Sequence, residues 1–305
     1  MRRVSIIIPT QRRPGFLRNA ARSALAQRLP DRIEAELVIV DNDPEATARV
    51  DAQETMLGAP FSVLYVHEPK PGVATARNAG LKAATGDLIA FLDDDEEAPP
   101  EWLGQLITSL DALGADAVFG PIETRLPPNQ SPFAPYFEAF FARSGPAADA
   151  LIPLAFGCGN CLILRRSLPD PVSPFPVARD HNGGEDDYVF SQMKEAGAKF
   201  GFCAAALVLE HPQPARLSLR YTLVRAFAYG QGGTAHRARR GLFSAPGIAF
   251  SMATGLGQFL VFGATALALR PFRPVDFARF AEKSARGLGK LFWLEAFYPK
   301  LYGRI

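Results

Sequence analysis

The sequence has little cysteine, little net charge and no long apolar run near its start. Three cysteines in 305 residues are too few for a disulfide scaffold, and one must stay unpaired in a monomer, so we expect a reducing compartment. A formal net charge of +2 argues against a general nucleic-acid binder, and we expect no nucleic-acid partner. The opening MRRVSIIIPT is too short an apolar stretch for a secretory signal, which predicts a cytosolic chain beginning with a strand.

Two phosphate-binding motifs are also missing. The chain contains no G-x-x-x-x-G-K-[ST], and no G-x-G-x-x-G follows its first predicted strand, which excludes P-loop nucleotidases and dinucleotide enzymes. The C-x-x-C at Cys158–Cys161 has no second pair and no suitably spaced histidines, so it favours neither zinc nor redox chemistry. We expect these small residues to line a ligand pocket.

Short β-branched runs alternate with helical stretches over the first hundred residues. The predicted strands are Val4–Thr10, Ala35–Asp43, Phe61–Glu68 and Asp87–Asp95, and the predicted helices are Phe16–Gln27 and Val73–Ala84. This alternation predicts a doubly wound α/β sheet. Ligands of such sheets bind outside the carboxyl ends of the strands, where Thr10, Asp41 and Asp93–Asp95 would converge.

The segment FLDDDEEAPPEW, residues 91–102, places five carboxylates directly after an apolar run. Two carboxylates about 4 Å apart repel by roughly 4 kcal/mol at an effective dielectric constant near 20, so a cation is expected among them. In an extended segment Asp93 and Asp95 would share one side and Asp94 the other. This arrangement favours Mg²⁺ or Mn²⁺ bound together with a phosphorylated substrate. The alternative is a solvated acidic turn before a helix that starts near Pro99.

Five segments in order resemble family 2 glycosyltransferases of the GT-A fold. They are SIIIPTQRR, VIVDND, PGVATARNAGLKAATGDLIAFLDDDE, GNCLILRR and GGEDDYVF, and the resemblance covers about residues 3–235. It implies a GT-A mixed sheet flanked by helices, a nucleotide-diphosphate sugar donor, a divalent metal, and inversion at the anomeric carbon. It also implies a catalytic domain at residues 1–235.

The resemblance assigns roles to individual residues around the donor. Asp95 is expected to be a direct metal ligand, with Asp93 or Asp94 facing the ribose and bridging waters. The other donor-binding residues are Asp41 at the nucleobase, Thr10 in the same pocket, and Arg77 near the base and phosphates. A surface ion pair on a helix is the alternative for Arg77.

The segment GGEDDYVFSQMKEAG leads into a predicted helix and supplies the expected catalytic acids. By resemblance, Asp186 is the base that deprotonates the acceptor hydroxyl, and Glu185 binds the acceptor. The alternative is that these acids only stabilise the start of the helix. His211 is expected to complete the metal site or touch the diphosphate, against the alternative of a histidine hydrogen-bonded inside a loop.

Contacts to the acceptor or to phosphate are expected from Asn160, Arg220 and Arg225. Residues around Arg225 read TLVRAF and lack the Q-x-x-R-W of processive synthases in the family. We therefore expect one sugar to be transferred per encounter.

The C-terminal part, residues 236–305, changes in character. Residues 241–269 contain no charge, with Arg237, Arg239 and Arg240 before them and Arg270 and Arg273 after them. Residues 275–294 form a basic amphipathic pattern suited to an anionic membrane surface. We expect a hairpin in the membrane interface, or a single span, at the cytoplasmic face of the cell membrane. A helical hairpin packed on the catalytic domain is the alternative.

The predicted function is a metal-dependent, inverting and non-processive glycosyltransferase that acts on a saccharide or lipid-linked acceptor in polysaccharide biosynthesis. One alternative is a membrane-attached carbohydrate-binding or scaffold protein without turnover. A sugar-phosphate nucleotidyltransferase is less favoured, because TQRRPG stands where its glycine-rich phosphate loop would follow the first strand.

Overall fold

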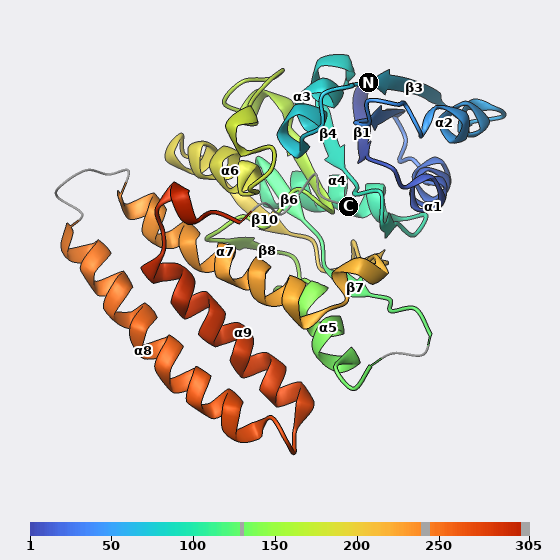
Figure 1. The fold of residues 1–305 in the computed structure, drawn as a ribbon. Coiled ribbons are helices and arrows are strands. Elements are labelled where there is room, and N and C mark those ends of the chain that lie inside the picture. Colours follow the sequence, from blue (N-terminus) through green and yellow to red (C-terminus); the bar gives the residue numbers. More distant parts are fainter. Residues whose placement is uncertain (129–130, 239–244, 300–305) are drawn as a thin grey trace. The chain divides into compact units, whose positions relative to one another are not determined.

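The computed structural model describes residues 1–128, 131–238 and 245–299 (Figure 1). The chain divides into two compact units. The first comprises Met1–Glu123 and Ala142–His211, and the second comprises Thr124–Phe141 and Pro212–Leu301.

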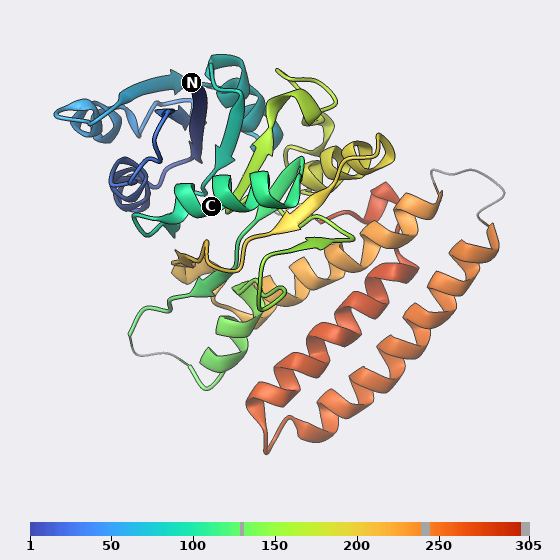
Figure 2. The same cartoon turned by 180° about the vertical axis from the view of Figure 1, so that it is seen from behind.

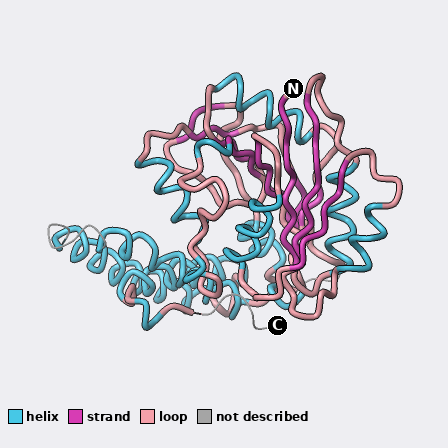
Figure 3. The backbone as a smooth tube through the Cα atoms, turned by 90° about the horizontal axis from the view of Figure 1, so that it is seen from above, coloured by secondary structure: helices cyan, strands magenta, loops and turns pink. Residues whose placement is uncertain are grey.

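The first unit is built on a mixed eight-stranded sheet. Its strands are β1 (Arg2–Thr10), β2 (Ile33–Asp41), β3 (Ser62–His67), β4 (Leu88–Phe91), β6 (Ala117–Phe119), β8 (Ala150–Ile152), β9 (Cys161–Leu164) and β10 (Phe200–Phe202). They lie in the order β3-β2-β1-β4-β9-β6-β10-β8, and the first four are parallel. Figure 3 shows strands of the sheet side by side, with helices beside them. Strand β9 is antiparallel to both of its neighbours, β4 and β6. The expected α/β class with a mixed sheet is confirmed.

Helices cover both faces of this sheet. One face carries α1 (Pro14–Leu25), α2 (Arg49–Met56) and α4 (Trp102–Leu113), and the other carries α3 (Val73–Ala83) and α6 (Glu185–Glu195). Figure 2 shows α4 crossing its face of the sheet. Helix α1 buries Leu17, Ala20, Ala21 and Ala24, whose spacing places them on one helical face. Gly80 lets α3 approach β1, because a Cβ there would lie 2.5 Å from a methyl carbon of Ile7.

The strand register brings polar residues together at the carboxyl edge of the sheet. Thr10 pairs with Asp41 at the ends of β1 and β2. The backbone N–H of Leu92 donates to the carbonyl of Ile7, so the acidic run begins beside the end of β1. The sequence predicted this convergence because parallel strands end at a common edge.

A second, three-stranded sheet leads from the acidic run to His211. Its strands are β5 (Glu96–Glu97), β11 (Val208–Glu210) and β7 (Ile122–Thr124), in that order. Glu96 pairs with Glu210 in antiparallel register. The next backbone contact joins the N–H of His211 to the carbonyl of Asp95 at 2.8 Å. Strand pairing therefore brings two predicted metal ligands together.

Four helices dominate the described part of the second unit. They are α5 (Ala134–Phe141), α7 (Leu219–Ala238), α8 (Ala245–Leu269) and α9 (Pro274–Leu291). Single 3₁₀ turns in the two units lie at Arg165–Ser167, Val177–Arg179, Pro214–Arg216 and Glu295–Phe297. An aromatic cluster on α5 packs against Ala278 of α9. Gly230 lets α7 and α9 meet at backbone distance, since a Cβ there would lie 2.1 Å from the carbonyl oxygen of Arg286.

The expected apolar and amphipathic segments match α8 and α9. Residues 241–244, Arg239 and Arg240 lie outside the described residues. Helix α7 belongs to the same compact unit as α8 and α9, although the predicted catalytic domain ended at residue 235. That domain boundary stays a prediction.

Candidate active site

The acidic run forms a buried turn. The backbone N–H of Glu96 donates to the carbonyl of Asp93 at 3.1 Å, which closes the turn. Asp94 and Asp95 are only 4% and 5% exposed. The solvated-turn alternative is therefore wrong, and so is the extended segment with side chains on alternating sides. A turn closed by its own backbone hydrogen bond cannot keep the alternation of a strand.

Arginines of the chain surround these carboxylates. The Arg13 Nη1 lies 2.8 Å from Asp94 Oδ1 and 3.6 Å from Asp95 Oδ2. Arg77 Nη2 lies 3.8 Å from Asp93 Oδ1. The guanidinium groups of Arg13 and Arg77 thus supply the nearby positive charge that the sequence predicted. Repulsion among these acids therefore does not by itself require a divalent ion, because guanidinium groups also supply positive charge.

Asp41 has one oxygen bound and one without a hydrogen-bond partner. Its side chain is fully buried, and its Oδ2 accepts from the backbone N–H of Ala48 at 2.8 Å and from the Tyr65 hydroxyl at 2.9 Å. Burial and the neighbouring Asp41 carboxylate raise the pKa of Tyr65 to about 12, so the phenol remains a donor. Asp41 Oδ1 is buried and has no hydrogen-bond partner among the described residues. It can accept from an N–H of a bound ligand.

Arg77 joins the acidic turn to the start of α6. Its guanidinium forms an ion pair with Glu185, and both side chains are almost completely buried. The same guanidinium lies over the rings of Phe91 and Phe175, with centroid distances of 6.0 and 5.7 Å. The alternative of a helix-surface ion pair is therefore wrong.

The N-terminus of α3, which carries Arg77, is anchored from a distant loop. Asp180 accepts from the Thr75 backbone N–H at 2.8 Å and from the Thr75 hydroxyl at 2.7 Å. Gly72 leaves room for this carboxylate, since a Cβ there would lie 2.1 Å from Asp180 Cγ. This cap satisfies a backbone donor at the helix start and ties α3 to the segment that precedes α6.

Glu185 and Asp186 open α6 in different environments. The helix follows Gly184, whose φ of 77° lies in the left-handed region. Burial raises the pKa of Glu185 to about 7, and the Asp186 charge adds to this while Arg77 opposes it. Asp186 is partly exposed, and its Oδ2 accepts from the backbone N–H of Cys158 at 3.4 Å. Of the two residues, Asp186 is the more exposed.

A loop of small residues brings the two acidic segments together. A Cβ at Gly157 would lie 3.0 Å from Asp186 Oδ2, and a Cβ at Gly159 would lie 2.9 Å from Asp93 Oδ2. The loop backbone can approach both carboxylates because these positions have no side chain. The neighbouring cysteines, Cys158 and Cys161, are buried free thiols.

Glu96 has a structural role that the sequence reasoning missed. Glu96 is 2% exposed and accepts from the backbone N–H groups of Asp93 at 2.9 Å and Asn160 at 3.2 Å. Burial, followed by the nearby Asp93 charge, raises the pKa of Glu96 well above its usual value. Its position inside the acidic run was the available signal in the sequence.

Asn160 is fully buried and uses its side-chain amide inside the protein. Its Oδ1 accepts from Trp102 Nε1 at 2.7 Å, and its Nδ2 donates to the carbonyls of Pro121 at 2.7 Å and Ala206 at 2.8 Å. The expected acceptor or phosphate contact of Asn160 stays a prediction, and these bonds favour a supporting role.

The remaining expected contacts lie in the second unit. Arg225 donates to the hydroxyls of Tyr229 at 2.5 Å and Tyr221 at 3.3 Å, and Arg220 is exposed on α7. Their contacts with acceptor or phosphate stay predictions.

A divalent ion fits this region only with help from a ligand. No group of three or more His, Cys, Asp or Glu side chains in the described residues is arranged to hold a metal. Asp95 and His211 are neighbours through strand pairing, and His211 Nε2 is a buried atom without a hydrogen bond in that part of the chain. It lies 3.3 Å from Glu97 Oε1. Mg²⁺ commonly uses one or two protein carboxylates and takes its other oxygens from phosphate and water, so two protein ligands fit an ion that arrives with a diphosphate.

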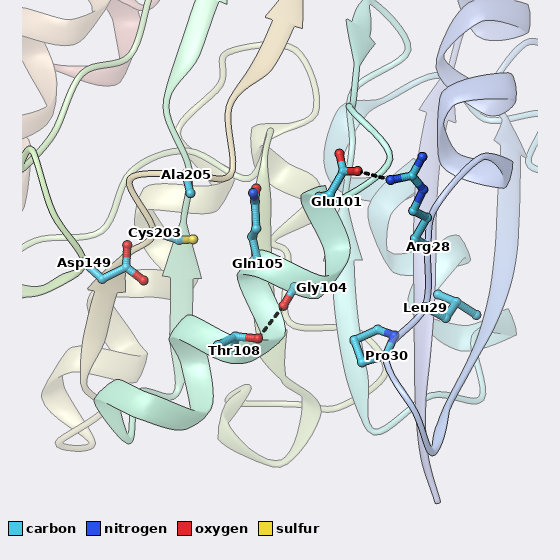
Figure 4. A pocket seen from close by; sticks show the side chains of 10 residues that line it. All are labelled: Arg28, Leu29, Pro30, Glu101, Gly104, Gln105, Thr108, Asp149, Cys203 and Ala205. Carbon is cyan, nitrogen blue, oxygen red and sulfur yellow. Dashed lines mark hydrogen bonds and ion pairs between the residues drawn. The ribbon is translucent and has the colours of Figure 1, made fainter.

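A hollow of about 470 Å³ lies elsewhere on the first unit, beside α4 (Figure 4). Its rim includes the ion pair of Arg28 with Glu101, and its other lining residues are Leu29, Pro30, Gly104, Gln105, Thr108, Asp149, Cys203 and Ala205. None of these is a predicted site residue. We assign the chemistry to the acidic cluster because the titratable groups and the ends of the parallel strands meet there.

Comparison with solved structures defines the fold as GT-A. The mannosyltransferase PcManGT from Pyrobaculum calidifontis, in complex with GDP-Man and Mn²⁺, matches with a TM-score of 0.63 at 18% identity, over 96% of this chain and 87% of that one. GalNAc-T7 with UDP, GalNAc and Mn²⁺ matches with a TM-score of 0.55 at 15% identity, over 77% and 51%. At these identities the likeness shows the fold alone.

Sequence comparison identifies the family. The model of glycosyl transferase family 2 matches residues 5–170. The succinoglycan biosynthesis protein ExoM of Rhizobium meliloti is 34% identical over 235 residues, which is 75% of this chain and 73% of that protein. The pre-mycofactocin glycosyltransferase of Mycobacterium tuberculosis is 26% identical over 273 residues, 84% of this chain and 54% of that protein. The chain belongs to glycosyl transferase family 2, and the predicted enzyme class, a glycosyltransferase, is confirmed.

Proposed function

We propose that this glycosyltransferase moves a sugar from a nucleotide-diphosphate sugar to an acceptor hydroxyl, with inversion and with a divalent metal. The observation that carries the proposal is Arg77, which links Asp93 of the acidic turn to the Glu185–Asp186 pair. The Arg77 guanidinium thereby connects the expected donor-binding residue Asp93 with Glu185, the neighbour of the expected base. The neighbours solved with GDP-Man or UDP and Mn²⁺ support the same donor class and metal.

The donor would lie at the carboxyl edge of the sheet. Asp41 Oδ1 would accept from the nucleobase, because it is a buried carboxylate oxygen that forms no hydrogen bond within the described residues. Thr10 bounds the same pocket through its bond to Asp94, at 2.8 Å. Asp95 and His211 would hold Mg²⁺ or Mn²⁺, and the ion would stabilise the charge of the leaving diphosphate.

Asp186 would act as the catalytic base. Its carboxylate takes the proton of the acceptor hydroxyl as that oxygen attacks the anomeric carbon, opposite the leaving group. The bond between the anomeric carbon and the phosphate oxygen breaks, and its electron pair leaves with the nucleoside diphosphate. Glu185 would position the acceptor side through its ion pair with Arg77. A single displacement of this kind inverts the anomeric centre.

The acceptor class is proposed from a relative. ExoM is named for succinoglycan biosynthesis, which supports a polysaccharide precursor, free or lipid-linked, as acceptor for this chain as well. The TLVRAF sequence around Arg225 supports a non-processive transfer. Family membership favours the enzyme over a binding protein without turnover, and it removes the reason to retain the nucleotidyltransferase alternative.

The test compares Asp186→Asn with Asp187→Asn. Asp187 is the exposed neighbour on the same helix, so its replacement removes the same charge without removing the proposed base. Purified protein is screened with nucleotide sugars and Mn²⁺ for ligand-dependent thermal stabilisation and for release of nucleoside diphosphate. We expect Asp186→Asn to keep donor binding and lose at least about 10²-fold in transfer, while Asp187→Asn stays within a few-fold of wild type. Undiminished transfer by Asp186→Asn would exclude it as the base.

We also propose that the second unit attaches to a membrane, at the cytoplasmic face of the cell membrane. Helix α8 is 25 residues long, has a window of mean hydropathy 1.6, and buries only 11% of that window. Phe250, Val261 and Leu267 are each more than 60% exposed. An apolar surface of this extent is expected to be covered by lipid.

The packing of α8 on α9 favours a helix pair lying in the membrane interface over a span. The two helices run antiparallel, because Gly255 meets Gly287 while Ser284 donates to the carbonyl of Phe259 at 2.9 Å. Helix α9 carries six charged residues between Asp276 and Lys290. A spanning α8 would pull these charges into the bilayer, at about 2.5–3.5 kcal/mol for each one near the centre. In the interface they stay in contact with water and anionic lipid headgroups.

Flotation with anionic vesicles tests the attachment. Val261→Lys is expected to weaken vesicle binding, whereas Val50→Lys, at an equally exposed valine of α2, is expected to leave it unchanged. Labelling with an impermeant maleimide then tests orientation, with His236→Cys before α8 and Arg270→Cys after it. Both cysteines should react from the same side of sealed vesicles. Reaction of only one from outside would mean that α8 spans the bilayer.

A further inference from the structure

Arg13 lies against the two buried aspartates of the acidic turn. It is the residue directly before α1, and its side chain is 18% exposed. Its guanidinium donates to Asp94 Oδ1 at 2.8 Å, and Thr10 donates to the other oxygen of the same carboxylate at 2.8 Å. Asp95 Oδ2 lies 3.6 Å from the same Arg13 nitrogen. Among the described arginines, Arg13 therefore lies against both buried carboxylates of the turn.

The other arginines nearby have separate partners. Arg12 pairs with Asp43 at 3.0 Å, and Arg18, one turn into α1, pairs with Asp51 at 2.8 Å. Arg77 serves Asp93 and Glu185. Each described arginine of this region thus pairs with different acidic residues, and Arg13 pairs with Asp94 and Asp95.

A divalent ion and Arg13 would compete for the same carboxylates. An ion bound at Asp95 would lie within a few ångströms of the guanidinium, where like charges repel strongly in a partly buried site. The planar guanidinium is also suited to two parallel hydrogen bonds with phosphate oxygens. A diphosphate that binds together with the ion would give Arg13 phosphate oxygens to pair with when the ion displaces it from Asp94 and Asp95.

We propose that Arg13 is an exchangeable counter-ion, which pairs with Asp94 and Asp95 and moves to the diphosphate of the donor when a divalent ion binds. This inference rests on the proposed function of the site. Its consequence is thermodynamic coupling: Arg13 weakens binding of the metal alone and strengthens binding of the diphosphate when metal is present. By linkage, each ligand then raises the affinity of the other by the same factor.

The experiment measures Mn²⁺ binding by electron paramagnetic resonance, with the full chain in detergent, with and without uridine or guanosine diphosphate. We expect Arg13→Gln to bind Mn²⁺ alone about tenfold more tightly than wild type, and to lose most of the coupling between metal and diphosphate, which is typically 5- to 150-fold. Arg18→Gln is the matched control, since it removes one positive charge from the first turns of α1 at a residue paired with Asp51. It should change neither constant.

A second variant separates the two roles of Arg13. Arg13→Lys keeps the charge but not the planar fork, so it should still weaken binding of Mn²⁺ alone while losing diphosphate affinity. Circular dichroism confirms that each variant is folded. Unchanged or weaker Mn²⁺ binding by Arg13→Gln would overturn the inference while leaving the proposed function intact. Failure of wild-type protein to bind Mn²⁺ with either diphosphate, or with any nucleotide sugar, would overturn both.

Discussion

The buried ion pair between Arg77 and Glu185 allows the sharpest test of how the site is held together. Replacing Arg77 by Met keeps much of the side-chain volume on α3 but leaves Glu185 buried beside Asp186 without a counter-charge. Removing one partner of a buried ion pair typically costs 3–5 kcal/mol of folding free energy. The second contact, with Asp93 at 3.8 Å, is worth about 4 kcal/mol at an effective dielectric constant of 20. Because the Asp93 side chain is 41% exposed, solvent screening reduces this to a minor share.

The loss should depend on pH, because Glu185 can take up a proton. Its pKa is already about 7 with Arg77 present, and removing the cation raises it further. Near pH 6 the variant would bury a neutral acid at a small cost. Near pH 8.5 the variant would either bury the charged Glu185 carboxylate or lose the free energy needed to protonate that group. We therefore expect Arg77→Met to lose about 1–2 kcal/mol at pH 6 and about 3–5 kcal/mol at pH 8.5.

The assay must report the first unit alone, since a chain of two units does not unfold as one. Trp102 is fully buried in the first unit, and the other tryptophan, Trp293, belongs to the second. In a Trp293→Phe background, fluorescence during urea unfolding therefore follows the first unit. Adding Glu185→Leu to Arg77→Met should restore most of the stability at pH 8.5, as removal of both charges leaves none unpaired. A loss below 1 kcal/mol at pH 8.5, or no rescue by Glu185→Leu, would refute a dominant role for this ion pair.

Three further predictions concern single residues. Wild type should lose about 3 kcal/mol of folding free energy relative to Glu185→Gln as pH rises from 4.5 to 7, measured in the same fluorescence assay. The reason is that a carboxyl group whose pKa is raised in the folded state stabilises the fold only while it is protonated. Parallel plots of stability against pH for the two proteins would contradict this. Gly230→Ala should separate α7 from α9 and lower the melting temperature of the second unit, whereas Gly232→Ala, with nothing within 4 Å of its Cβ, should not; equal effects would show that the close contact is unimportant. Asn160→Ala should cost at least about 3 kcal/mol and red-shift Trp102 emission, since it leaves the indole N–H unpaired and puts alanine at a φ of 50°; an unshifted spectrum would argue against that hydrogen bond.

Local patterns in the sequence determined the framework. The β-branched runs that end at Thr10 and Asp41 predicted parallel strands, and the structure pairs these two residues at the sheet edge. The order of the acidic motifs along the chain predicted family 2. These features could be predicted because hydrophobic period and motif order lie in stretches of ten or twenty residues.

Tertiary structure alone decided which charges meet. Arg13 contacts an aspartate 81 positions away, and Arg77 contacts a glutamate 108 positions away. The signal for Arg13 was its place beside Thr10 at a strand end, but many arginines lie near strand ends. Repulsion among the acids predicted that a cation must be close, and it could not tell an arginine from a metal. Pairing between residues so distant in sequence depends on how strands and helices pack, so it leaves no local pattern to find.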